Sequence, residues 1–148
     1  MIRVAVSSQQ QAVAIDKNRM RETVRTVLSG ECRKNADISL AFVDNATIQT
    51  LNQRYLRHDE PTDVLSFPLE ETSGHLVGEL VIGAEIAVRQ AQSLGHDIQA
   101  ELALYLIHGL LHLCGYDDQT SDAAAKMRQR ERYYLGQLGL PDIAPHPD

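Results

Sequence analysis

The sequence predicts one α+β domain, in which a small mixed sheet of four strands is covered by about five helices. All four strand-like segments fall within residues 2–82 and three helical segments follow them, an order typical of α+β folds. The 148 residues can bury a substantial core, and no linker or internal repeat divides them. With 43% hydrophobic and 23% charged residues, the composition is that of an ordinary globular protein. We therefore expect a single domain over residues 1–148.

Alternating apolar residues and capping residues define the first four elements. Asp16 is suited to cap the first helix and Gly30 to end it. Either Asp44 or Asn45 is suited to cap the second helix. In chain order, we expect a strand over residues 2–6, a helix over about 17–29, a strand over 38–43 and a short helix through Tyr55.

The middle of the chain is expected to supply the other two strands, paired with each other. An extended segment begins after Pro61. Pro68 lacks the N–H that an inner strand donates, so this segment is expected at a sheet edge or to end there. A polar turn over residues 70–74 then leads into a fourth strand over residues 76–82.

The remainder of the chain is expected to be helical. Gly95 separates the first two of three helices, and Ser121 is a suitable cap for the last. The proline-rich tail over residues 139–148 is expected to fray. The three helices are predicted over about 84–94, 98–114 and 121–135.

The helix over residues 98–114 is apolar on every side, which is typical of a helix buried on several faces. His108 and His112 lie within it four positions apart, so both imidazoles point from the same face. Gly115 then ends the helix. The following turn is expected to return Asp117 and Asp118 toward that face.

Two stacked imidazoles and a carboxylate predict a metal site. Zinc binds His nitrogen and carboxylate oxygen, and a catalytic zinc keeps three protein ligands with one open position. The alternative is that both histidines are core residues bonded to the backbone. Each would then need its own polar partner in a dry setting, which favours the metal.

One class of metalloenzyme is disfavoured by the residue after His108. Metalloproteases with this helical spacing carry a glutamate there as general base, whereas this chain has Gly109. A glycine at this position could instead let another backbone or a substrate approach the metal closely.

The net charge of −6 argues against a nucleic-acid partner, but the charges are clustered. Residues 17–34 carry six basic and two acidic side chains, and residues 126–132 carry four basic and one acidic side chain. Residues 35–125, between these two clusters, carry three basic and fourteen acidic side chains. Such clusters can build a local positive field, or they can be solvated helix faces. Three basic residues of the first helix recur at four-residue spacing: Lys17, Arg21 and Arg25.

Three features of the sequence predict a cytoplasmic protein. No apolar run approaches the length that spans a bilayer, and the first residues lack the pattern of a signal peptide. Two cysteines, Cys32 and Cys114, do not make a disulfide framework, and Cys114 is expected to be a small core residue.

The segment HGLLHLCGYD over residues 108–117 resembles the signature of the YbeY family, single-strand-specific metalloendoribonucleases of ribosomal RNA maturation. PTDVLSFP over 61–68 and GELVI over 78–82 match further blocks of that family, with spacing kept from about residue 41 to 138. The resemblance implies one Zn²⁺ per chain and processing of precursor RNA at the 16S 3′ end. It also implies the small ribosomal subunit as a partner.

The chain departs from the family pattern at the third metal ligand. The family carries a histidine six positions after the second histidine, and this chain carries Asp118. The ligand set implied by the resemblance is therefore His108, His112 and Asp118. A carboxylate is harder than imidazole and could favour another divalent ion. Other donors considered for the third position are Asp117, His58, His75 and His96.

A second departure concerns the arginine that the family is thought to use in RNA cleavage. It follows the tyrosine equivalent to Tyr55, where this chain has Leu56, and arginine comes one place later. Arg57 is therefore the candidate catalytic phosphate clamp, with a solvated loop arginine as the alternative.

Together these observations predict a metal-dependent endoribonuclease acting on single-stranded RNA, by water attack or by attack of the ribose 2′-hydroxyl. Lys17, Arg21 and Arg25 are candidate contacts to RNA phosphates. The alternatives are a non-catalytic, ribosome-associated RNA-binding factor with a weakened or structural metal site, and a metallohydrolase of another substrate class.

Overall fold

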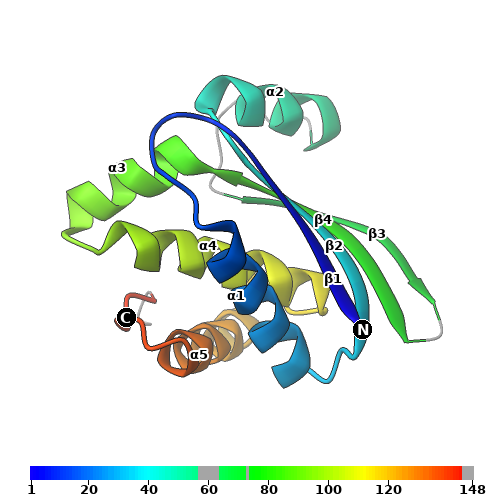
Figure 1. Ribbon diagram of the computed structural model, residues 1–148. Helices are drawn as coiled ribbons and strands as arrows, with labels where there is room; N and C mark the ends of the chain where they lie inside the picture. The colour runs from blue at the N-terminus through cyan, green and yellow to red at the C-terminus, as the bar shows by residue number, and fades with distance from the viewer. Residues whose placement is uncertain (57–63, 73, 145–148) are drawn as a thin grey trace.

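The computed structural model describes residues 1–56, 64–72 and 74–144, and within them it has five helices and one four-stranded sheet. The spatial order is β1-β2-β4-β3, with β1–β2 and β2–β4 parallel and β3–β4 antiparallel (Figure 1). This confirms the predicted α+β fold. The elements are β1 (Ile2–Gln9), α1 (Lys17–Gly30), β2 (Asn35–Val43), α2 (Asn45–Leu56), β3 (Val64–Thr72), β4 (His75–Gly83), α3 (Ala84–Leu94), α4 (Ile98–Leu113) and α5 (Ser121–Gln137).

Strand ends extend beyond the predicted segments because pairing continues through polar residues. β1 was expected to end at Val6, but it pairs with β2 as far as Gln9 opposite Val43. β3 is an edge strand as predicted, and its register shifts between Pro68 and Glu70.

The structure shows which residues cap helices α1, α2 and α5. The Asp16 carboxylate accepts from the Arg19 N–H at 3.2 Å, as predicted for α1. Asp44, rather than Asn45, caps α2 through a 2.8 Å bond from the Thr47 N–H. The Ser121 prediction was wrong: Thr120 caps α5, because its hydroxyl accepts from the Ala123 N–H at 3.1 Å and Ser121 is already helical.

The two faces of the sheet are covered differently. Alternate residues of a strand point to opposite faces, so Ile38 and Leu40 face the main core while Ala41 and Val43 face the other side. On the main side α4 packs against β3, β4, α1, α3 and α5. Figure 1 shows α4 running between the sheet, α1 and α5, with α2 set apart at one end of the sheet.

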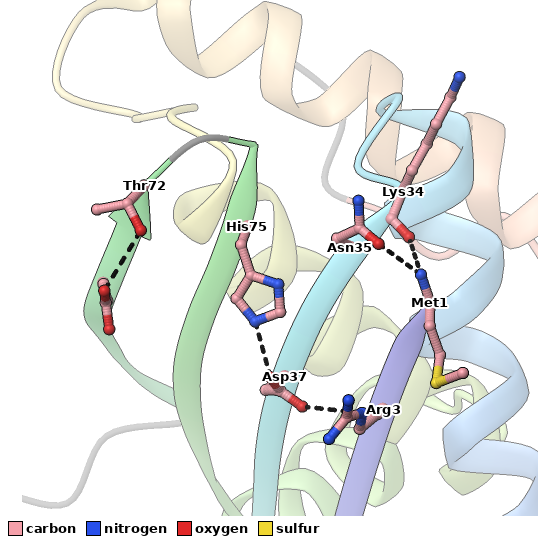
Figure 2. Close-up of polar contacts among 8 residues, drawn as sticks. Met1, Arg3, Lys34, Asn35, Asp37, Thr72 and His75 are labelled. Carbon is pink, nitrogen blue, oxygen red and sulfur yellow. Dashed lines mark hydrogen bonds and ion pairs between the residues drawn. The ribbon is translucent and has the colours of Figure 1, made fainter.

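The face opposite α4 is polar near the start of β1. Asp37 lies between two basic side chains, with its carboxylate 2.7 Å from His75 Nε2 and 3.8 Å from Arg3 Nε (Figure 2). The amino terminus of Met1 donates to the Asn35 side chain at 2.7 Å. His75 is therefore occupied on the sheet face that α4 does not cover.

The end of the chain is packed further than the predicted fraying suggested. Leu140 and Ile143 pack against the main core, and Ala144 is 2% exposed. These apolar contacts hold the tail through Ala144, while residues 145–148 lie outside the described part. No helix in the described ranges combines the length and apolar content needed to cross a membrane.

Gly109 sets how closely α4 approaches the sheet. A Cβ at this position would lie 2.9 Å from Leu80 Cδ2 and 3.1 Å from Val64 Cγ2, and the Ser66 hydroxyl donates to the Gly109 carbonyl at 3.3 Å. The glycine therefore serves contact between the helix and the sheet, and not the approach to a metal that its position suggested.

Replacing Gly109 by alanine is expected to destabilise the protein. The added methyl overpacks the contact at a cost of about 1–3 kcal/mol, which exceeds the helix-propensity gain of up to about 1 kcal/mol. Urea unfolding of the metal-free protein measures the difference. Gly136→Ala is the matched control, because the space around that helical glycine is open, and it should be neutral or stabilising. A Gly109→Ala protein as stable as the control would contradict the packing described.

Candidate metal centre

The end of α4 is built to reverse the chain. Gly115 has φ 103°, which favours glycine, and its N–H donates to the His112 carbonyl at 3.0 Å. The Tyr116 N–H donates to the Leu111 carbonyl at 3.0 Å. The turn therefore carries the next residues back along α4, as the sequence predicted.

This turn brings Asp118 to the two histidines of α4. One donor atom from each of His108, His112 and Asp118 lies within 4.8 Å of the others, and no other such group occurs in the described ranges. The imidazole rings are 4.7 Å apart at 80° to each other. Both histidines are partly buried and Asp118 is exposed. The helix thus fixes two donors and the loop supplies the third.

The other candidate donors are engaged elsewhere or lie outside the described residues. Asp117 accepts from the Gln119 N–H at 3.1 Å and so shapes the turn. His96 is hydrogen-bonded to Glu101, and His75 lies on the far face of the sheet. His58 falls in the part that the structure does not describe, and so does Arg57, the candidate phosphate clamp.

The donor set fits a divalent ion. Zinc–ligand bonds of about 2.0–2.2 Å in a tetrahedron place ligand atoms about 3.3–3.6 Å apart, which an exposed loop carboxylate can reach by a small movement. Burial lowers the pKa of His112, and neighbouring His108 lowers it further, against weaker opposing effects of Asp118, the Tyr116 backbone and Asp117. A low pKa keeps the imidazole neutral, the form that binds metals.

A cavity of about 330 Å³ opens beside His108. Its walls come from α3, α4, α5, the loop after α4 and the tail, and they include Asp118. Two buried carboxylates, Glu101 and Glu131, also line it. A small group could therefore reach His108 and Asp118 from this side.

Glu31, at the end of α1, bonds to α5 beside the turn that carries Asp118. The Glu31 carboxylate is 9% exposed, and it accepts from Arg130 Nη2 at 2.6 Å and from the hydroxyl of Tyr134. Tyr116 lines the same surface pocket as Glu31. Burial acts to raise the pKa of Glu31, but its interactions with Tyr134, Arg130 and Tyr116 outweigh this effect, so the pKa is lowered.

The arginines of α5 lie close to acidic side chains. On α5, Arg128 pairs with Glu131, Arg130 with Glu31, and Arg132 lies 3.6 Å from Asp142. α5 therefore offers less unpaired positive charge than its sequence suggests.

The candidate RNA contacts lie on α1. Lys17 and Arg25 are exposed, while Arg21 Nε donates to the Val4 carbonyl at 3.3 Å and its Nη1 to the Asn18 side chain at 2.9 Å. No described residue of α1 lines the cavity beside His108.

The cysteines form no disulfide. Cys32 is exposed, and Cys114 is partly buried in the turn. Burial raises the pKa of the Cys114 thiol to about 11, which fits the expected packing role rather than metal binding.

Comparison with known proteins gives a consistent result. The sequence model of the family described as "Endoribonuclease YbeY" matches residues 5–139. "Endoribonuclease YbeY" of Pelotomaculum thermopropionicum is 40% identical over 148 residues, covering 93% of this chain and 97% of the relative. The protein of the same name from Aquifex aeolicus is 37% identical, covering 84% and 85%. The solution structure of TM1509 from Thermotoga maritima matches with a TM-score of 0.60 at 22% identity, covering 97% and 99%, and so supports the fold.

Glu31→Gln is expected to destabilise the metal-free protein in a pH-dependent manner. Because the folded-state pKa of Glu31 lies below the ordinary value of 4.5, its ionised form stabilises the fold above that pH. This contribution is lost as the pH falls through the lower folded-state value. Loss of the charge-assisted bonds should cost about 1–3 kcal/mol at pH 7 and progressively less in acid.

Urea unfolding at neutral and acidic pH, with metal removed by a chelator, measures this difference. Glu22→Gln is the control, since Glu22 is exposed on α1, the helix that Glu31 follows. A Glu31→Gln deficit that stays constant or grows as the pH falls would contradict the role given to this carboxylate.

Proposed function

Because the chain belongs to the YbeY endoribonuclease family, we propose that it is a metal-dependent endoribonuclease that cleaves single-stranded RNA. The observation that best supports this proposal is the convergence of His108, His112 and Asp118 beside a cavity. The proposed substrate is precursor ribosomal RNA at the 16S 3′ end, with the small ribosomal subunit as partner and the cytoplasm as location.

The proposed cofactor is one Zn²⁺ per chain, and the carboxylate of Asp118 also suits another divalent ion. When bound, such an ion would polarise a phosphoryl oxygen and lower the pKa of water. His108 and His112 would hold it on a helix that is packed on every other side, which fixes two donors before binding. Asp118 would close the site from the loop.

Either water or the ribose 2′-hydroxyl is proposed as the attacking group. Arg57 is proposed to contact the scissile phosphate, since in the sequence it comes one residue after the position at which the family carries its arginine. Its placement lies outside the described residues.

RNA binding is proposed to involve the basic side of α1. Lys17 and Arg25 are exposed there and are the stronger candidates. Arg21 is hydrogen-bonded to β1 and Asn18, and its positive charge is proposed to attract RNA phosphates that bind nearby. Because α1 does not line the cavity, these side chains are proposed to hold RNA at a distance from the cleaved bond.

A second candidate function is a non-catalytic, ribosome-associated RNA-binding factor. It is favoured by Asp118 at the third ligand position and by Leu56 in place of the arginine. It shares the fold and RNA contacts of the first proposal, so cleavage is what separates the two.

The central test is cleavage of single-stranded RNA by protein whose zinc content has been measured. We expect one zinc per chain and cleavage that falls by more than about 100-fold in His112→Ala, since changes beyond the direct ligands already cost 10–100-fold. His75→Ala is the control, because that histidine is bound to Asp37 on the far sheet face. Zinc-containing wild-type protein that binds RNA without cleaving it would support the binding factor instead.

The RNA path is tested by the salt dependence of affinity. Each lost phosphate contact should reduce the slope of log affinity against log salt by about 0.7 for a single strand, so Lys17→Ala with Arg25→Ala should reduce it by about 1.4. Arg89→Ala removes an exposed arginine from α3 and should leave the slope unchanged. Equal slopes in the double variant and wild type would exclude α1 from the RNA contact, and zinc content should not change.

A further inference from the structure

Glu131 is a buried carboxylate next to a metal-binding histidine. Its side chain is 0% exposed on the inner side of α5. Arg128 Nη1 donates to Glu131 Oε2 at 2.7 Å and also contacts Oε1. Glu131 Oε1 lies 3.5 Å from Nδ1 of His108 on the facing helix. The carboxylate thus stands between the arginine that compensates its charge and the imidazole.

We propose that Glu131 is a positioning residue that turns His108 so that Nε2 points to the metal. The inference rests on the metal site of the proposed function. Nδ1 faces the carboxylate, so an Nδ1–H can be directed to Oε1 and the lone pair of Nε2 is left for the ion. A carboxylate behind a metal-binding imidazole fixes both the orientation of the ring and its tautomer.

The distance and the surroundings fit this role. The 3.5 Å separation is about 0.3 Å longer than the longest ordinary N–H···O hydrogen bond, so the proposed role requires the imidazole and the carboxylate to approach by about that amount. Arg128 comes from the same turn of α5 and is itself partly buried, so it holds the carboxylate in place and compensates its charge. Without such a partner, a buried carboxylate would be costly.

The competing explanation is that Glu131 only joins α5 to α4 through buried polar contacts. The chain provides a matched comparison in Glu101, which is 3% exposed, lines the same cavity and bonds to a histidine. That histidine is His96, which does not belong to the group of three donors. Glu101→Gln and Glu131→Gln therefore make the same chemical change in the lining of the same cavity, but only the second lies beside His108.

The first measurement is zinc affinity by competition with a chromophoric chelator. Glu131→Gln should weaken zinc binding by about 10–100-fold, whereas Glu101→Gln should stay within about twofold of wild type. Equal losses in both variants would indicate a general effect of buried charge and overturn the proposal. Unchanged affinity in Glu131→Gln would also overturn it. If Glu131→Gln does not fold, Glu131→Asp keeps the charge, retracts it from Nδ1 and should show the same loss.

The second measurement needs no metal. Nitrogen-15 NMR of the metal-free protein at about pH 8, where an ordinary imidazole is neutral, reports the His108 tautomer. We expect the Nδ1–H form in wild type and a mixture in Glu131→Gln, because the amide can donate as well as accept. The opposite tautomer in wild type would overturn the role of Glu131, whereas zinc binding without RNA cleavage would contradict only the proposed function.

Discussion

The structure depends on the burial of α4 on all sides but one. Strands β3 and β4 cover one side of the helix, and α1, α3 and α5 cover others. Close approach to the sheet is possible because Gly109 presents no side chain to Leu80 and Val64. The side that remains carries His108 and His112, and His108 lines a cavity. Apolar packing of the helix therefore holds the two histidine side chains in a fixed relation to each other.

Stability and the site share their polar contacts. Glu31 ties the end of α1 to α5 through Arg130 and Tyr134. Arg33 ties the same segment to the turn after α4, because its Nη2 donates to the Cys114 carbonyl at 3.2 Å. The loop that delivers Asp118 is therefore fastened at its start, while Asp118 itself stays exposed. Such a loop can close on an ion at little cost to the rest of the fold.

Local patterns predicted the elements and the shared helix face of His108 and His112. The burial of the apolar helix and its end before Gly115 follow from neighbouring residues, and the structure confirms both. The C-terminal end of β1 and the cap of α5 were missed, because strand pairing and a hydroxyl contact overrode the local pattern.

The contacts around the site could not be predicted, because they join distant parts of the chain. Glu31 and Arg130 are 99 positions apart, and no spacing rule connects them. Glu131 did leave a trace in the sequence, since it is a charged residue within the apolar stripe of Met127, Tyr134 and Leu135. The count of charged residues also overestimated the unpaired positive charge of α5, because Arg128 and Arg130 form ion pairs with acidic side chains.

The most direct test of the central claim is a crystal structure with anomalous diffraction measured at the zinc edge. The account predicts one peak at about 2.0–2.2 Å from Nε2 of His108, a nitrogen of His112 and a carboxylate oxygen of Asp118, with a coordination position open toward the cavity. A zinc-saturated crystal with no peak between these three side chains, or with a peak bound by other residues, would contradict it.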